Sequence, residues 1–116
     1  MAVLTTGAVG VETGTAMLFD HIESDGKMWA ATGDRVLVRT IKLHEPFSAP
    51  PVVHVAQNII DAASETNLRM MLTVEAVTEQ SFDVQVATWA DTRIGRLGIS
   101  WLAIGPVRDP EEYWDV

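Results

Sequence analysis

The clearest pattern of hydrophobic and polar positions lies in residues 68–89, where apolar side chains alternate with other residues along two consecutive segments. The apolar phase of these segments consists of Leu68, Met70, Leu72, Val74 and Ala76, followed by Phe82, Val84 and Val86. An alternation with a period of two residues is typical of a β-strand with one buried face. A turn centred on Glu79 pairs Val74 with Val84 and Leu72 with Val86, so the pattern predicts a hairpin whose inner face is apolar.

The other phase of the same hairpin faces away from the core and carries an aromatic and a basic residue. The register that joins the apolar residues places Arg69 directly opposite Trp89, near the open end of the hairpin. An indole and a guanidinium are therefore expected side by side on an outer surface. The same register sets Glu75 against Asp83, a like-charge pair that mildly disfavours it.

The rest of the chain is predicted to form short strands joined by polar, glycine- and proline-containing connections. Further strands are expected at residues 35–43, 52–56 and 99–104. Connections are expected at 45–51, which contains three prolines, and at the polar segments 58–67 and 90–98. Since six or so short strands are expected and no segment has a convincing helical period, the sequence predicts an all-β sandwich or barrel.

The chain has 116 residues, which fits a single domain. Residues 1–26 are rich in Thr, Gly and Ala and are expected to form an N-terminal arm or an edge strand. Residues 27–105 are expected to form the sandwich, and residues 106–116 an acidic, aromatic tail.

The charge and composition disfavour several kinds of partner. Eight basic and sixteen acidic residues give a net charge of -8, which repels nucleic acids and anionic membranes. No apolar run approaches the roughly 20 residues that cross a bilayer, and the start of the chain lacks the basic region of a signal peptide. We therefore expect synthesis in the cytoplasm, with release by lysis or as part of a particle. Because cysteine is absent, no disulfide is expected.

The sequence lacks the motifs of common enzyme classes: a Gly-x-Ser-x-Gly elbow, a His-Glu-x-x-His pair, a phosphate loop and a dinucleotide fingerprint. We therefore expect no catalysis and no cofactor. The three histidines are far apart in sequence, and two of them lie in strand-like runs, where a structural histidine is the commoner outcome. His21, Glu23 and Asp25 are spaced like the first half of a calcium loop, but Thr32 stands where a bidentate acid is needed. A solvated acidic turn is the preferred interpretation, and no metal is expected.

Trp89 and Arg69 together offer what sugar recognition needs. An aromatic ring can stack on the C–H face of a pyranose, and a planar charged group can bind pairs of vicinal hydroxyls. A structural alternative is equally open: Trp89 could pack against a neighbouring subunit while Arg69 covers it through a cation–π contact.

Several spaced motifs resemble those of the H-type lectins, the family of the snail agglutinins and the C-terminal domains of discoidins. The matching segments are residues 46–53, 66–69, 82, 88–93 and 100–105. The resemblance covers about residues 11–105. It implies a six-stranded antiparallel β-sandwich that assembles as a homotrimer. It also implies calcium-independent binding of galactose or N-acetylgalactosamine at clefts between subunits.

The resemblance implies roles for individual residues as well. Arg69 and Trp89 match the sugar-contacting arginine and tryptophan of the family. Asp34, beside Gly33, is similar to the family's hydroxyl-binding aspartate, although the match needs a gap and an ordinary turn aspartate is the alternative. In the lectin hypothesis built on these matches, Asp34 together with Asp91 or Arg93 tunes selectivity between sugars.

The chain also departs from the family pattern. The snail lectins have a histidine directly after the tryptophan and a tyrosine six residues past it, whereas this chain has Ala90 and Gly95. A hydrogen-bonding ring and a second aromatic wall are thus missing, so the pocket can accept a different sugar from that of the snail lectins. Secreted members also carry cysteines that this chain lacks.

Two other functions are weighed against the lectin. The same trimer could be a structural spike, fibre, baseplate or adhesion component of a phage-like particle, with the N-terminal arm and residues 113–114 docking to other structural proteins of the particle. The third function is a hydrolase that uses Asp34 and Asp91 as paired carboxylates. It is the least favoured, because nothing in the sequence places these residues about 5 to 9 Å apart.

Overall fold

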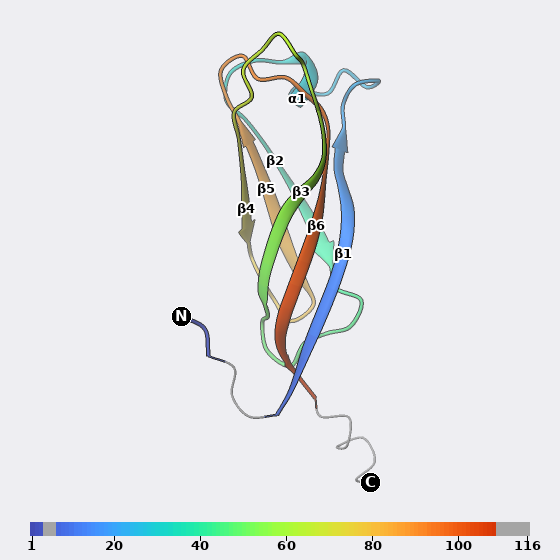
Figure 1. Ribbon diagram of the computed structural model, residues 1–116, viewed down its shortest axis with the longest axis vertical. Helices are drawn as coiled ribbons and strands as arrows, with labels where there is room; N and C mark the ends of the chain where they lie inside the picture. Colours follow the sequence, from blue (N-terminus) through green and yellow to red (C-terminus); the bar gives the residue numbers. More distant parts are fainter. Residues whose placement is uncertain (4–6, 109–116) are drawn as a thin grey trace.

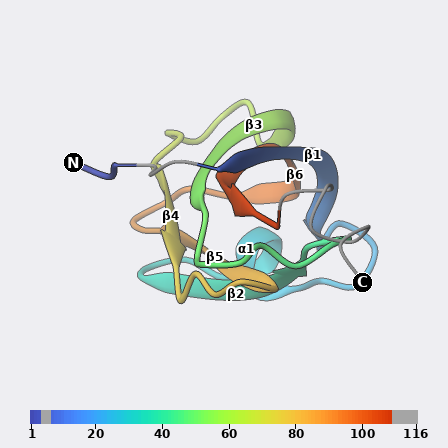
Figure 2. The same ribbon diagram turned by 90° about the horizontal axis from the view of Figure 1, so that it is seen from below.

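Two three-stranded antiparallel sheets pack face to face in the computed structural model, which describes residues 1–3 and 7–108. The strands are β1 (Ala8–Asp20), β2 (Arg35–Lys42), β3 (Val52–Ala62), β4 (Met70–Glu75), β5 (Ser81–Thr88) and β6 (Ile94–Val107), and one short helix, α1, spans Lys27–Ala30. One sheet has the strand order β1-β6-β3 and the other β2-β5-β4, and Figure 2 shows the two layers end-on. The predicted all-β class, with six strands in a sandwich, is confirmed.

No helix in the described part of the chain is long and apolar enough to cross a membrane.

The core lies between the sheets and is built mainly from β5 and β6. Its fully or nearly fully buried apolar side chains are Leu18, Phe19, Met28, Leu37, Phe47, Phe82, Val84, Val86, Ile94, Leu97, Ile99, Trp101 and Ala103. Phe82 of β5 meets Trp101 of β6 edge to face, with 5.5 Å between ring centres, which joins the two layers at the middle of the sandwich.

The predicted hairpin register is confirmed. Strand β4 pairs with β5 so that Leu72 lies opposite Val86 and Val74 opposite Val84. The unfavourable Glu75–Asp83 pair is present as well, and Thr40 of β2 donates a hydrogen bond of 2.7 Å to the Asp83 carboxylate. That bond adds a donor beside the two like charges, which reduces their mutual repulsion.

Two predicted connections were partly wrong because strands extend into them. Strand β3 continues through Ala62, where a polar loop was expected from residue 58, and β6 begins at Ile94 instead of residue 99. A bulge between Gln57 and Ile59, opposite Gly98, keeps the polar stretch of β3 in the ladder. Burial of Ile94 and Leu97 anchors the early part of β6 in the core.

The N-terminal segment contributes an edge strand. Strand β1 pairs along its whole length with β6, and the side chains of Leu18 and Phe19, near its end, are buried in the core. The acidic turn after it leads into α1, which buries Met28 completely. At the other end of the chain, β6 extends to Val107, and the expected aromatic tail at residues 109–116 lies outside the described residues.

Candidate functional site

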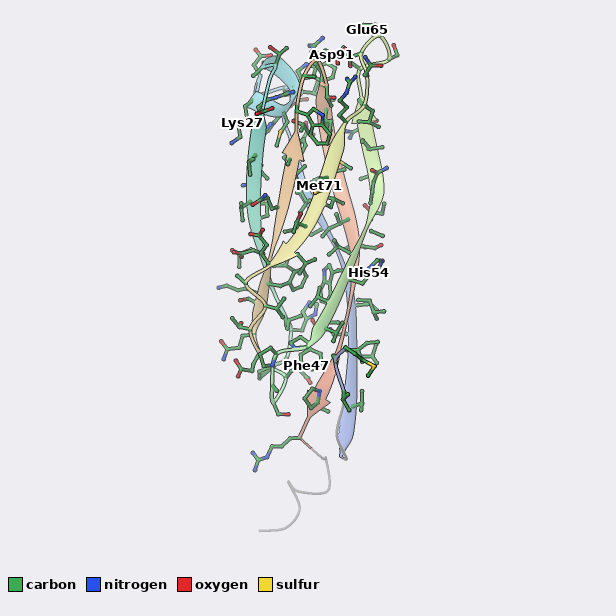
Figure 3. All side chains as sticks on the ribbon, turned by 90° about the vertical axis from the view of Figure 1, so that its left-hand side faces the viewer. Lys27, Phe47, His54, Glu65, Met71 and Asp91 are labelled. Carbon is green, nitrogen blue, oxygen red and sulfur yellow. The ribbon has the colours of Figure 1, made fainter. Side chains whose placement is uncertain are left out.

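The predicted site residues gather at the end of the sandwich where α1 lies. Figure 1 shows α1, the β3–β4 connection and the β5–β6 connection together at the top of the molecule, away from both chain termini. In Figure 3 Asp91 and Lys27 are labelled at this same end. The site therefore combines segments that are far apart in sequence.

Register places Asp34, Trp89 and Arg69 in one row across the sheet β2-β5-β4. Thr88 is paired with Arg35 on one side and with Met70 on the other. One position farther toward the end of the sandwich, Trp89 therefore lies between Asp34 and Arg69. A hydrogen bond of 2.8 Å from the Gly33 N–H to the Ala90 carbonyl continues the ladder past them. Because neighbouring residues of a strand alternate between faces, and Thr88 is buried, the three side chains belong to the outer face.

The side chains of this row are accessible. Trp89 keeps 38% of its surface exposed and is not part of the core, and Asp34 is also exposed. The Arg69 side chain is 39% exposed and belongs to the same outer face. The structure thus has the indole and the guanidinium on one open face, as the hairpin register predicted.

Asp91 holds Arg69 in place. Its carboxylate accepts a hydrogen bond of 2.9 Å from Nη1 of Arg69 on one oxygen. The other oxygen accepts bonds from the backbone N–H and the side-chain amide of Asn67, at 3.2 and 3.4 Å. The bond from the Asn67 backbone, together with the charge of Arg69, lowers the pKa of Asp91, so this carboxylate stays ionised.

Thr92 joins the β5–β6 connection to the backbone just before β4. It is completely buried, and its hydroxyl accepts a bond of 2.9 Å from the Arg69 N–H while donating one of 2.7 Å to the Asn67 carbonyl. These bonds fix the backbone that carries Arg69. Thr92 was not among the predicted site residues, since its only signal in the sequence is a threonine directly after the acidic residue of the loop.

Arg93 contacts Trp29 instead of Trp89. Its Nε donates a bond of 2.8 Å to the Trp29 carbonyl, and its guanidinium lies over the Trp29 ring, 4.4 Å from the ring centre. Arg93 therefore joins the β5–β6 connection to α1. Packing at this end also explains why residue 95 is a glycine, since a Cβ there would come within 2.3 Å of Ile22 and 3.3 Å of Trp29.

Arg35 positions the segment that carries Asp34. It is almost fully buried, and it donates hydrogen bonds to the carbonyls of Gly33 (2.8 Å) and Ala31 (2.9 Å) and, more weakly, to two carbonyls of α1. Burial lowers the pKa of this guanidinium. Gly33 has a φ of 80°, which lets the chain turn from α1 into β2 beside Trp89.

His21 lies half-buried at this end of the sandwich. Its Nδ1 accepts a hydrogen bond of 3.3 Å from the Met28 N–H, and its ring lies against Phe19 with centres 4.8 Å apart. Burial lowers the pKa of His21, and the positive charges of Arg39 and Lys27 lower it further. Among residues 1–3 and 7–108 no group of three His, Cys, Asp or Glu side chains is placed to hold a metal ion.

The lowered pKa of Asp91 does not suit the general-acid role of a paired-carboxylate hydrolase, because a general acid in a glycosidase needs a raised pKa.

Comparisons with known proteins agree with the fold and the resemblance. The model of the H-type lectin domain matches residues 38–104. A protein of Fuscovulum blasticum called "ATP synthase subunits region ORF 7" is 40% identical over 109 residues, which cover 94% of each chain. Among solved structures, recombinant discoidin II of Dictyostelium discoideum superposes with a TM-score of 0.75 and wild-type discoidin II with 0.74, both at 23% identity. The two alignments cover 90% and 89% of this chain, which spans only 40% and 39% of those proteins.

Proposed function

Because this chain belongs to the H-type lectin domain family, we propose that it is a non-catalytic carbohydrate-binding protein whose sugar site is the outer-face row of Asp34, Trp89 and Arg69. The observation that carries the proposal is the exposed indole of Trp89 in register with Arg69 at an open end of the sandwich. Gly33 shapes the backbone beside this row.

The chemistry of the row suits a hexose. The indole provides a flat apolar surface for the C–H face of the ring. The Arg69 guanidinium carries five N–H donors in a fixed plane, so it can bind Asp91 and a pair of sugar hydroxyls at once. Asp34, on the other side of Trp89, offers acceptors for hydroxyl protons. Galactose or N-acetylgalactosamine is the expected type of sugar, on the family resemblance.

The residues near the row divide into two roles. Asp91 orients Arg69 and adds a negative charge beside the hydroxyl site. Arg93 is committed to Trp29, so we assign it to positioning the β5–β6 connection, and it affects selectivity only through that connection.

We further propose that the protein acts as a homotrimer assembled through the outer face of the sheet β1-β6-β3. This face exposes five large apolar side chains, Val9, Val11, Met17, Val52 and Ile59, beside polar residues in its middle rows. His54, labelled in Figure 3, lies on the same face in a row with Thr13 and Leu102. Three copies packed through this face would cover the apolar surface.

The charged side chains of this face lie together at one end of the sheet, where they would form part of a polar rim. Arg96 of β6 pairs with Asp20 of β1 and Asp61 of β3 across the sheet, and its Nε donates a bond of 2.6 Å to the Asp61 carboxylate. These groups stay hydrated at the rim when the centre is covered.

A trimer would also explain how a shallow site can be useful. A single exposed sugar site of this kind has a dissociation constant of about 1 mM. Three sites on one particle that engage a surface glycan together can bind about 10² to 10⁴ times more tightly than one.

The test combines a glycan array with light scattering. The wild type is expected to bind neutral galactose-type glycans as a trimer. Trp89→Ala and Arg69→Ala are expected to lose binding by at least tenfold while remaining trimers. Gln85→Ala, on the same outer face two positions before Ala87, is the matched control and should bind normally.

The opposite result is equally clear. If the wild type binds no glycan, or if Trp89→Ala breaks the trimer, the indole belongs to a structural contact and the lectin proposal is refuted. Val11→Asp tests the assembly separately, because a charge in the apolar face should give monomers. If Val11→Asp remains trimeric, the subunits meet through another surface.

A further inference from the structure

The row next to the proposed sugar site is apolar across all three strands. Ala87 of β5 pairs with Val36 of β2 on one side and with Met71 of β4 on the other. Val36 is 45% exposed and Met71 55% exposed, so both offer apolar surface to solvent. Figure 3 shows Met71 on β4 on the side of Asp91 and away from the Phe47 end of the sandwich.

The apolar row is bounded on both sides. Toward the end of the sandwich it meets Trp89, and toward the middle it gives way to a row with Gln85 at its centre and then to one with Asp83. Since alternate residues of a strand are about 7 Å apart, a hexose stacked on Trp89 lies next to Ala87.

The three side chains of the row differ in size. Ala87 carries a single methyl group and stands between two larger residues, Val36 and Met71. A small apolar group on the sugar can therefore sit over Ala87 and contact both neighbours. A hydroxyl in the same place would leave water without gaining a hydrogen-bond partner among these three side chains, which is unfavourable.

The charges around the site favour a neutral sugar over an acidic one. Arg69 is paired with Asp91, and Arg93 is held by Trp29. The Lys27 ammonium donates a hydrogen bond to the Val36 carbonyl at the edge of β2. Bonds to neutral carbonyls leave the charges of Arg93 and Lys27 in place, but these two cations are directed at Trp29 and at the edge of β2. The carboxylates of Asp34 and Asp91 lie beside the row and would repel a carboxylate or sulfate.

We propose that Val36, Ala87 and Met71 form a subsite for a methyl group on a neutral sugar, such as the C6 methyl of a 6-deoxyhexose or an O-methyl group. This inference rests on the proposed sugar site at Trp89 and specifies the class of sugar that the site prefers. Burial of one methyl-sized group gives about a fourfold gain in affinity.

The experiment compares matched sugars by titration calorimetry or NMR on the full chain. Galactose, and other neutral hexoses found to bind, are each compared with their 6-deoxy and O-methyl forms. The wild type is expected to favour at least one methyl-bearing form by about fourfold. The double variant Val36→Thr/Met71→Gln replaces apolar groups by polar ones of similar size and should bring that ratio close to one while binding the parent sugar normally.

Thr40→Ser and Thr73→Ser are the control variants, because both lie on the same outer face farther from Trp89. Their ratios should match the wild type.

Three results would overturn the subsite. They are a wild-type ratio of one or less for every pair, an unchanged preference in the double variant, and loss of the trimer in the double variant, which would assign the row to a subunit contact. In the first two cases parent sugars still bind, so the lectin proposal survives. Absence of binding to every sugar would refute both proposals.

Discussion

The bond network of Thr92 links the stability of the fold to the geometry of the proposed site, and Thr92→Val tests it. Valine has nearly the shape of threonine but lacks the hydroxyl. In the wild type that hydroxyl accepts the Arg69 N–H at 2.9 Å and donates to the Asn67 carbonyl at 2.7 Å. Removing it leaves both backbone groups without this partner, at a position whose side chain has 0% exposed surface.

The expected loss of stability follows from those two bonds. A buried polar group left without a partner costs about 1 to 3 kcal/mol. The Arg69 N–H bears the larger share, because Asn67 lies at the surface and its carbonyl can regain water. We therefore expect Thr92→Val to lower the free energy of unfolding by about 2 kcal/mol, and sugar binding to weaken because Arg69 is no longer held in line with Trp89.

Urea denaturation at fixed protein concentration measures the first effect and sugar titration the second. Thr92→Ser is the matched control, since it keeps the hydroxyl and loses only a methyl group. The reasoning predicts that the valine variant loses more sugar affinity than the serine variant, even where both are folded. If the serine variant binds sugar as weakly as the valine variant, the hydroxyl does not position Arg69 and the argument is refuted.

Three further changes test other parts of the structure. Because the pKa of His21 is lower in the fold than in the unfolded chain, the unfolded state binds more protons, so stability should fall as the pH drops below about 6.5; His21→Asn should flatten this dependence in urea titrations at several pH values. Ala90 has a φ of 59°, which strains any residue other than glycine, so Ala90→Gly should raise the free energy of unfolding by about 0.5 to 1 kcal/mol and with it the thermal midpoint. An unchanged or lower midpoint would contradict this strain. Gly14→Val should destabilise strongly in the same assay, since a Cβ there would come within 2.5 Å of the Trp101 ring; a folded variant of normal stability would show that the ring can move aside.

The part of the fold that could be predicted from sequence is the part where one sheet face is buried and the other is not. Strand β5 alternates strictly between half-buried and buried residues, and a shift of one residue would expose Phe82 and Val84, so its pattern determines the register. The expected pairing of Val74 with Val84 was therefore right. Strand β2, rich in β-branched residues, was predicted nearly to its observed bounds.

The other sheet was predicted less well because its strands do not alternate cleanly. Strand β6 is buried almost continuously over residues 94–99, and charged residues within β3 and β6 suggested loops. Asp61 and Arg96 neutralise each other across the sheet, which lets both remain in strands. A single sequence does not show such a pair, since its members are 35 residues apart.

The site divides in the same way between what a local pattern can reveal and what only the folded chain brings together. Arg69 and Trp89 face each other across one hairpin, so the register that pairs the core of the hairpin also aligns them. Arg93 is close to Trp89 in sequence, but it stacks on Trp29, which arrives from α1 through a separate connection. The surface beside the proposed sugar is likewise set by β2 and β4, strands whose sequences carry no lectin motif there. If the subsite over Ala87 is correct, changes at Val36 and Met71 should alter which sugar is preferred without affecting whether one is bound, because the indole and guanidinium that hold the ring lie one row away.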